Sequence, residues 1–312
     1  MNIAISSIGT ATAVGLLKCI RNIDKDIKII GLDINELGYT AGSLLVDNFY
    51  KVPLYNDKLY CEKLLSIFVK EKIDMFMPIH DFEVKKVAEY IELFKGYKII
   101  IPNIDIINLF SDKYKANIEM QKIGISIPKI VDTNYSYKKI LREKVSVGSK
   151  GVKVIHGNFD IKLNEDEFLQ EYIEGEEYTV DILADLNGQA IIIIPRKRLE
   201  VKAGVATKTK LVYESRLINM CKIILSRYKI PGLSNVQFIE GKDGNFYFIE
   251  LNTRFGGMSI SSVLGSFNYI GDFIQLAFHK EISHKNFEEN MQKVKWNSII
   301  TRYYEEKIYY EE

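Results

Sequence analysis

The chain has 312 residues, of which 47% are hydrophobic and 27% charged, and its formal net charge is +1. This near-neutral balance argues against nucleic acid or an anionic membrane surface as the main partner. No apolar run approaches the roughly 20 residues that a membrane span needs. Three widely spaced cysteines and a start without a cationic leader favour a reduced, cytoplasmic protein.

Short apolar runs alternate with helical patterns over the first hundred residues. We expect strands at 2–6, 27–32, 75–78 and 98–101, and helices at 10–21, 57–71 and 81–94. Such alternation predicts a parallel, doubly wound α/β sheet, and we assign residues 1–108 to this Rossmann-like domain. Asp33 ends the second strand where a ribose-binding acid stands in dinucleotide folds, but the G-x-G-x-x-G loop is missing, which disfavours NAD.

After residue 107 the sequence pattern changes from strand–helix alternation to hairpins and antiparallel strands. Ser111 and Asp112 precede a helical stretch, and either side chain can accept from the free amides at a helix N-terminus. We place a second, α+β domain over residues 109–312.

A hairpin near residue 243 carries the most informative side chains. Glu250 and Asn252 lie two residues apart in an apolar run, so a strand presents both on one face. The turn 241–245 and the alternating segment before it predict antiparallel pairing that brings Gln237 close to Glu250. One carboxylate and two carboxamides suit a hard cation, Mg²⁺ or Mn²⁺, that completes its shell with phosphate and water.

Arginines surround this hairpin in the sequence. Arg254 follows Asn252 by two residues, and its planar fork suits a phosphate or carboxylate. The run 190–204 predicts a strand with Arg196, Arg198, Glu200 and Lys202 on one face. That ladder is either a solvated strand face or a phosphate-binding surface.

Several segments, taken in order, resemble the ATP-grasp ligases, especially the group of the carbamoyl-phosphate synthase large subunit and the pyrrolysine-pathway ligase. They are 110–114 (FSDKY), 123–128 (IGISIP), 148–152 (GSKGV), 170–181 (QEYIEGEEYTVD), 234–238 (SNVQF) and 246–257 (FYFIELNTRFGG). The resemblance implies a pre-ATP-grasp domain followed by a two-lobed ATP-grasp domain. The lid subdomain, at approximately 128–170, is shorter than the family's usual lid.

The resemblance also implies roles for individual residues. Lys113, Arg142 and Lys144 would approach the ATP phosphates, with Arg142 standing where the family usually has lysine. A glycine-rich turn would cover the phosphates, the segment 170–173 would supply backbone contacts to adenine, and Arg196 or Arg198 would stabilise the transferring phosphoryl group. The turn comprises Gly148, Ser149, Lys150 and Gly151; the adenine contacts are Glu171, Tyr172 and Ile173; and Glu177 would hold the ribose.

These inferences predict an ATP-dependent carboxylate–amine ligase that forms an amide through an acyl phosphate and releases ADP and phosphate. The substrates would be small, such as an amino acid, a peptide or an amino sugar, and the chain is a possible homodimer. Three alternatives stay open: carbamoyl-phosphate-synthase-like or carboxylase-like activation of bicarbonate with partner chains, a nucleotide-binding subunit without catalysis, and an NAD-dependent oxidoreductase.

Overall fold

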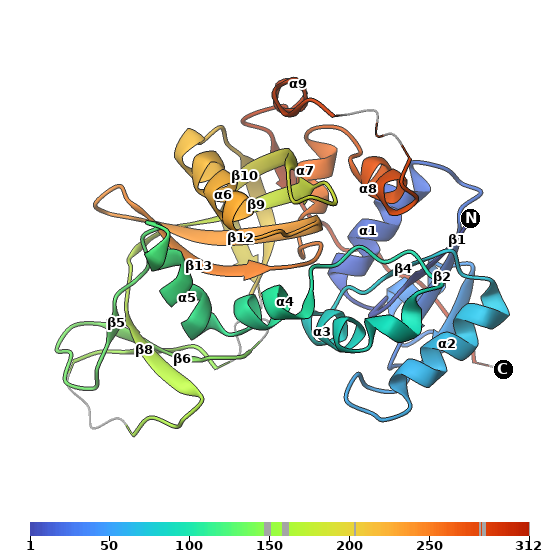
Figure 1. Cartoon of the computed structure of the whole chain (residues 1–312), viewed down its shortest axis with the longest axis horizontal. Helices are drawn as coiled ribbons and strands as arrows, with labels where there is room; N and C mark the ends of the chain where they lie inside the picture. The colour runs from blue at the N-terminus through green and yellow to red at the C-terminus, as the bar shows by residue number, and fades with distance from the viewer. Residues whose placement is uncertain (147–150, 158–161, 203, 281, 283–284, 312) are drawn as a thin grey trace.

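Three sheets organise the chain. The computed structural model describes residues 1–146, 151–157, 162–202, 204–280, 282 and 285–311. A four-stranded sheet forms in the N-terminal part, a second four-stranded sheet in the middle of the sequence, and a six-stranded sheet in the C-terminal half. Figure 1 shows the six-stranded sheet between the other two, which lie at opposite ends of the molecule.

The N-terminal sheet is parallel, with the order β3-β2-β1-β4. This arrangement confirms the predicted α/β fold class, because helices connect the parallel strands. The elements are β1 (Asn2–Ile5), α1 (Ala11–Arg21), β2 (Lys28–Asp33), β3 (Asn48–Lys51), α2 (Tyr60–Glu71), β4 (Met75–Met77) and α3 (Asp81–Glu89).

Two details of this domain differ from the sequence-based expectation. The expected strand at 98–101 is a single parallel bridge between Met75 and Lys98. Ile99 and Ile101 instead pack against the buried cluster around Phe68 and Phe76, and Pro102, which lacks an N–H, follows them. The half-buried strand β3 was not predicted, because its sequence NFYK offers no clean apolar run.

The carboxylate of Glu71, the last residue of α2, is buried. The Glu71 residue is only 7% exposed, and its carboxylate accepts from Lys28 Nζ (2.8 Å), Asn48 Nδ2 (2.9 Å) and Tyr50 Oη. Hydrogen bonds from Lys28 and Tyr50 lower the pKa of Glu71 from 4.5 to about 2. The carboxylate form is therefore favoured by the fold.

We expect Glu71→Gln to reduce the acid sensitivity of the protein. A carboxyl group with a folded-state pKa below its unfolded value stabilises the fold above pH 4.5, and this contribution is lost as the pH falls from 4.5 towards 2. The difference in unfolding midpoint between pH 7 and pH 3, measured in urea, should be smaller for Glu71→Gln than for the wild type. An unchanged difference would contradict the role of this carboxylate.

The middle of the chain forms helices and then a small antiparallel sheet of order β5-β8-β6-β7. Asp112 caps the second helix by accepting from the Lys115 amide at 3.0 Å, as one of the two predicted caps. The described residues between 128 and 170 contain strands and turns but no helix. The elements are α4 (Ile104–Ser111), α5 (Lys113–Lys122), β5 (Ile130–Val131), β6 (Lys139–Glu143), β7 (Lys153–Ile155) and β8 (Glu167–Glu171).

The six-stranded sheet is antiparallel, with the order β13-β12-β9-β10-β11-β14. α6 packs on β9 and β10, whereas α7 and α8 contact α1 of the N-terminal domain. The elements are β9 (Gly175–Ala184), β10 (Ala190–Lys202), β11 (Val205–Leu211), α6 (Ser215–Arg227), β12 (Gly232–Gly241), β13 (Phe246–Asn252), α7 (Ile260–Leu264), α8 (Ile270–Ala277), α9 (Phe287–Gln292) and β14 (Ile299–Thr301).

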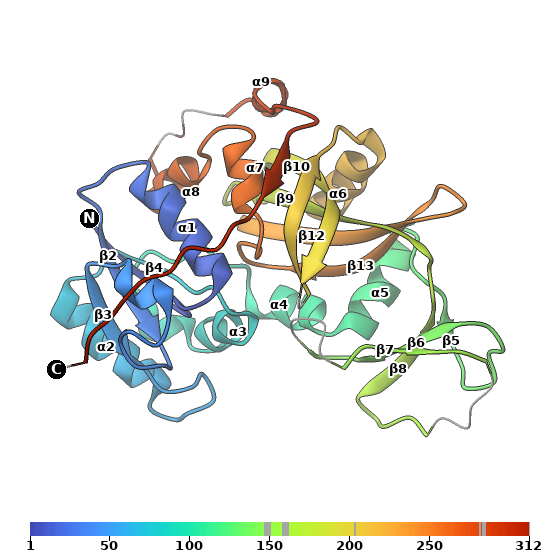
Figure 2. The same cartoon turned by 180° about the vertical axis from the view of Figure 1, so that it is seen from behind.

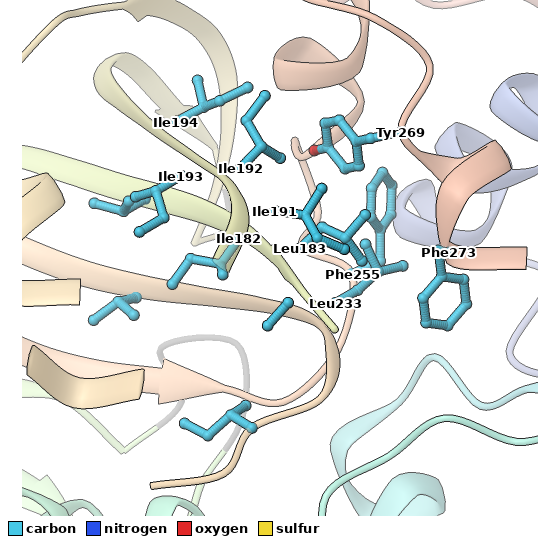
Figure 3. Packing of buried hydrophobic residues seen from close by; sticks show 14 of the residues in the cluster. Ile182, Leu183, Ile191, Ile192, Ile193, Ile194, Leu233, Phe255, Tyr269 and Phe273 are labelled. Atoms are coloured by element: carbon cyan, nitrogen blue, oxygen red, sulfur yellow. The ribbon is translucent and has the colours of Figure 1, made fainter. Parts of the chain in front are cut away.

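The largest hydrophobic cluster spans this sheet and the helices beside it. Figure 3 shows isoleucines of β9 and β10 with Leu233, Phe255 and Phe273, which come from β12, the loop after β13 and α8. Burying one such side chain contributes about 1.5–3 kcal/mol. This packing fixes the loop after β13 against the end of the sheet.

The C-terminal segment links the two halves of the molecule. Figure 2 shows the chain after β14 crossing α1 and ending beside the N-terminal sheet. Lys18 Nζ lies 5.9 Å from the centre of the Tyr303 ring, and Tyr309 packs closely against Gly38. Every helix in the described parts of the chain is too short or too polar to traverse a bilayer.

Candidate active site

The predicted hairpin is present, and its register places the candidate metal ligands together. Gln237 is the cross-strand partner of Glu250, and Asn235 is the partner of Asn252. Cross-strand partners share a face of the sheet. The turn and the alternation predicted the hairpin and the proximity of Gln237 to Glu250, whereas their direct pairing depends on a register shift between Gln237 and Phe238 that leaves Ile249 unpaired.

Direct contacts join these side chains. Glu250 Oε1 accepts from Gln237 Nε2 at 2.8 Å and from Asn252 Nδ2 at 3.3 Å. Asn252 Nδ2 also donates to Asn235 Oδ1 at 3.2 Å, and Asn235 Nδ2 donates to the Arg254 carbonyl at 3.0 Å. Asn235 was not predicted, although it lies two residues before Gln237 and alternation alone places it on this face.

This donor set fits one hard cation. Among the described residues no group of three or more His, Cys, Asp or Glu is arranged to hold a metal ion. The hairpin cluster instead offers one carboxylate and carboxamide groups whose oxygens turn towards a cation by rotation of the amide. Such a set leaves coordination positions for phosphate oxygens and water, as Mg²⁺ requires.

Arginines from two other elements, β10 and β6, approach Gln237 and Glu250. Arg198 Nη1 donates to Gln237 Oε1 at 3.2 Å and lies 2.8 Å from the Glu177 carboxylate. Arg142 Nη1 donates to Gln170 Oε1 at 3.1 Å, and its Nη2 lies 3.8 Å from Glu250 Oε2. Burial lowers the pKa of both guanidinium groups. The structure thus brings Arg142, Arg198 and Glu177 to the hairpin, and their predicted contacts with the nucleotide stay predictions.

Lys113 lines a cleft together with Glu250 and Asn252. Its Nζ donates to the Ser146 carbonyl at 2.5 Å and to Ser146 Oγ at 3.1 Å. Burial lowers the pKa of Lys113, and the nearby charge of Glu250 opposes this shift. Ser146, which was not singled out from the sequence, holds the ammonium at the edge of the cleft.

Arg254 has an unexpected partner. Its Nε and Nη2 donate to the two carboxylate oxygens of Asp81 at 3.0 and 2.8 Å. Asp81 is the first residue of α3 in the N-terminal domain, so this bidentate pair joins the two domains. The cleft between them is lined by Asp81, Phe82, Ile107, Phe110, Ser111, Lys113, Val145, Ser146, Glu250, Leu251, Asn252, Thr253 and Arg254. The guanidinium that we assigned to phosphate or substrate carboxylate is here held by Asp81.

Arg196 is buried in a structural ion pair. Its Nε donates to Asp181 Oδ2 at 2.7 Å, and the two side chains are 3% and 2% exposed. Ser259 and Ser262 also donate to Asp181. The structure gives Arg196 this partner in place of the expected contact with a phosphoryl group, because a buried carboxylate requires a cation beside it.

The basic ladder of β10 is also interrupted. The pairing with β11 shifts register between Arg198 and Val201. Beyond the shift, Glu200 pairs with Lys202 and Lys208 at the surface. The expectation of one continuous charged face from Arg196 to Lys202 is therefore wrong, because the irregular pairing breaks the alternation.

The residues expected at the adenine are engaged within the lid sheet. The Glu171 amide donates to the Lys129 carbonyl at 2.9 Å, and the Tyr172 amide donates to the Lys138 carbonyl at 3.0 Å. These two amides are therefore not the adenine donors in this conformation, which corrects that part of the prediction. Ile173, the next residue, stays a predicted contact.

The glycine-rich turn is only partly described. Gly148, Ser149 and Lys150 lie outside the described residues, whereas Gly151 has φ of +75° and packs on the side chain of Glu143. Lys144 Nζ donates to the Glu165 carbonyl and lies 5.7 Å from the Tyr114 ring centre. Its side chain is thus held by the lid itself, which differs from the expected approach to the phosphates.

Comparisons with known families agree with this arrangement. Residues 3–101 match the PylC-like N-terminal domain, and residues 164–300 match the family "ATP-grasp in the biosynthetic pathway with Ter operon". The biotin carboxylase of Campylobacter jejuni, solved with an ATP analogue, aligns with a TM-score of 0.73 over 96% of this chain and 74% of that chain, at 18% identity.

Two relatives illustrate the sequence similarity. The carbamoyl-phosphate synthase of Methanobrevibacter smithii is 23% identical over 257 residues, which cover 73% of this chain and 70% of that protein. The 3-methyl-D-ornithine–L-lysine ligase of Methanosarcina barkeri is 22% identical over 243 residues, 73% of this chain and 65% of that protein. Across its relatives, the chain spans from 25% to 70% of their length.

The fold, the hairpin and the two family matches define the class of the chain: an ATP-grasp domain, matched over residues 164–300, follows a PylC-like N-terminal domain, matched over residues 3–101. The relatives of the chain include carbamoyl-phosphate synthases and the 3-methyl-D-ornithine–L-lysine ligases. The predicted domain boundary at residues 108 and 109 stays a prediction.

Proposed function

We propose that the chain is an ATP-dependent carboxylate–amine ligase that releases ADP and phosphate. The observation that carries this proposal is the contact of Gln237 and Asn252 with Glu250 on one sheet face, with Arg198, Arg142 and Lys113 around it. One cation site ringed by three positive side chains matches the charge of a nucleotide triphosphate and its metal. The ligase relatives support the same reaction class.

The side chains divide the work by position. Glu250, Gln237 and Asn252 would hold Mg²⁺, which when bound neutralises phosphate charge. Arg198 and Lys113 would orient the γ-phosphate for attack by a substrate carboxylate oxygen, with ADP as leaving group. An amine nitrogen would then attack the acyl carbon, expel phosphate and lose its proton. No protein nucleophile is needed, because positioning and charge neutralisation lower the barrier.

Cofactors, cellular compartment and oligomeric state are also part of the proposed function. The cofactors would be ATP with Mg²⁺ or Mn²⁺, and the protein would act in the cytoplasm, where ATP is abundant, as a possible homodimer. Activation of bicarbonate is the second candidate, since carbamoyl-phosphate synthases and biotin carboxylases are among the relatives. An NAD-dependent reaction is disfavoured, because Asp33 Oδ2 already accepts from the Gly9 amide at 2.8 Å.

Phosphate release from MgATP separates these possibilities. The wild type would be assayed with a panel of amino acids and small carboxylates, with and without amines, and separately with bicarbonate. Turnover that needs both an acid and an amine supports the ligase, and turnover with bicarbonate alone supports the second candidate. Binding of MgATP without any turnover would refute the proposed activity, and absence of binding would refute a nucleotide site as well.

A further inference from the structure

Arg302 lies at the far end of the sheet face that carries the metal cluster. Thr209 of β11 pairs with Arg198 on one side and with Ile300 of β14 on the other, so all three share that face. Two residues further along, the Arg302 amide donates to the Thr207 carbonyl at 2.8 Å, which makes Arg302 and Thr207 cross-strand neighbours on the same face.

Arg302 is a half-buried cation that has no acidic partner in the part of the chain that the structure describes. Among the described residues, its guanidinium makes one hydrogen bond, from Nη2 to the Gly257 carbonyl at 2.6 Å. Burial and the charge of Arg196 lower its pKa, so the fold disfavours this cation as it stands. In contrast, Arg196, Arg198 and Arg254 each have a carboxylate partner. A desolvated guanidinium with spare donors is a costly arrangement that an anion relieves.

The neighbour of Arg302 is also unsatisfied. Thr207 Oγ1 is buried and has no hydrogen-bond partner within the described part of the chain. An unpartnered buried hydroxyl is destabilising, because it has lost its hydrogen bonds to water without replacing them. The Thr207 hydroxyl and the remaining donors of the Arg302 fork therefore lie side by side, one neutral and one charged, without an acceptor among the described residues.

Gly257 packs beside Arg302 at this corner of the sheet. A Cβ atom at Gly257 would lie 2.9 Å from Val205 Cγ1 and 3.7 Å from Thr12 Oγ1, so the loop after β13 here approaches both β11 and the start of α1. The corner is about two strand spacings from β10, or roughly 10 Å. That separation matches the length of a small extended substrate whose other end lies at Arg198.

We propose that Arg302 and Thr207 form a subsite for a second, non-reacting carboxylate, so that one substrate is of the amino-acid type. The inference rests on the proposed ligase function, which places the reacting carboxylate near Arg198. A planar guanidinium suits the two oxygens of a carboxylate, and the hydroxyl donates to one of them. The non-reacting carboxylate thereby sets the orientation of the substrate.

Paired ligands test this subsite. Amino acids and their α-amides would be titrated by calorimetry into the protein saturated with MgADP, because the amide removes only the charge of the carboxylate. For at least one amino acid we expect the acid to bind on the order of 10- to 100-fold more tightly than its amide. Arg302→Gln should abolish this preference, Arg302→Lys should restore part of it, and Thr207→Val should weaken it.

Controls separate this inference from the general function. Arg227→Gln, at an exposed arginine that ends α6, should keep the wild-type preference. Equal losses for acid and amide in Arg302→Gln would show a purely structural role, and the absence of any acid preference in the wild type would also overturn the subsite. Either result leaves the ligase proposal intact if MgATP binds. Failure of MgATP binding refutes the ligase proposal, and the same titrations repeated without nucleotide then test the acid preference by itself.

Discussion

Glu250→Gln is expected to lower the rate of ATP-dependent phosphate release by about 10²- to 10³-fold, the usual effect of removing one preorganised electrostatic group. The substitution keeps the size of the side chain and its contacts with Gln237 and Asn252, but removes the one formal negative charge of the cluster. Loss of this charge weakens the attraction for Mg²⁺ and leaves Arg142 beside a neutral group.

A titration with MgCl₂ distinguishes this effect from misfolding. The variant should need a higher Mg²⁺ concentration for half-maximal turnover, while its circular dichroism spectrum stays that of the wild type. Glu174→Gln is the matched control, since Glu174 is an exposed glutamate of the same domain paired with Lys242. An Mg²⁺ dependence of Glu250→Gln equal to that of the wild type would exclude Glu250 as a ligand.

Asp181→Ala is expected to lower the free energy of unfolding by about 3–5 kcal/mol, because it leaves a buried guanidinium without its partner. Asp181 accepts from Arg196, Ser259 and Ser262, and Ser259 Oγ in turn accepts from the Gly256 amide at 2.9 Å. The carboxylate thus joins β9 and β10 to the loop after β13. The change would be measured by urea unfolding at pH 7.

The double variant Asp181→Leu/Arg196→Met provides the comparison. It removes both charges together, and replacing a buried ion pair by apolar side chains is often neutral or stabilising. We therefore expect the double variant to be more stable than Asp181→Ala. Equal destabilisation would mean that the serine contacts and local packing, rather than the ion pair, determine stability at this position.

Local patterns in the sequence predicted the hairpin and the parallel sheet. The turn between β12 and β13 and the alternation on both sides indicated the hairpin and brought Gln237 close to Glu250. The direct pairing of these two residues depends on a register shift between Gln237 and Phe238, which local patterns did not predict. The parallel sheet followed in the same way from strand–helix alternation. The predicted strand at 98–101 was wrong, because this segment has the apolar composition of a strand but forms only one bridge before the proline that follows it.

Long-range partners could not be predicted. Asp81 and Arg254 are 173 residues apart, and nothing local to either position indicates their pairing. Arg196 and Arg198 look equivalent in the sequence, yet one is buried against Asp181 and the other contacts Gln237. Which cation receives a buried acid depends on the loop that covers the sheet, and this loop is placed by tertiary packing.

The strands that carry the chemistry also build the core, with different residues of the same strand. Along β13, Glu250 and Asn252 face the cleft, whereas Phe248 and Leu251 are buried in the hydrophobic cluster on either side of the register shift at Ile249. The same few strands therefore carry both the residues of the site and the residues of the core, at different positions. The core positions can exchange apolar residues of similar volume while the site positions exchange polar groups. Substrate preference and stability can therefore evolve almost independently on this scaffold.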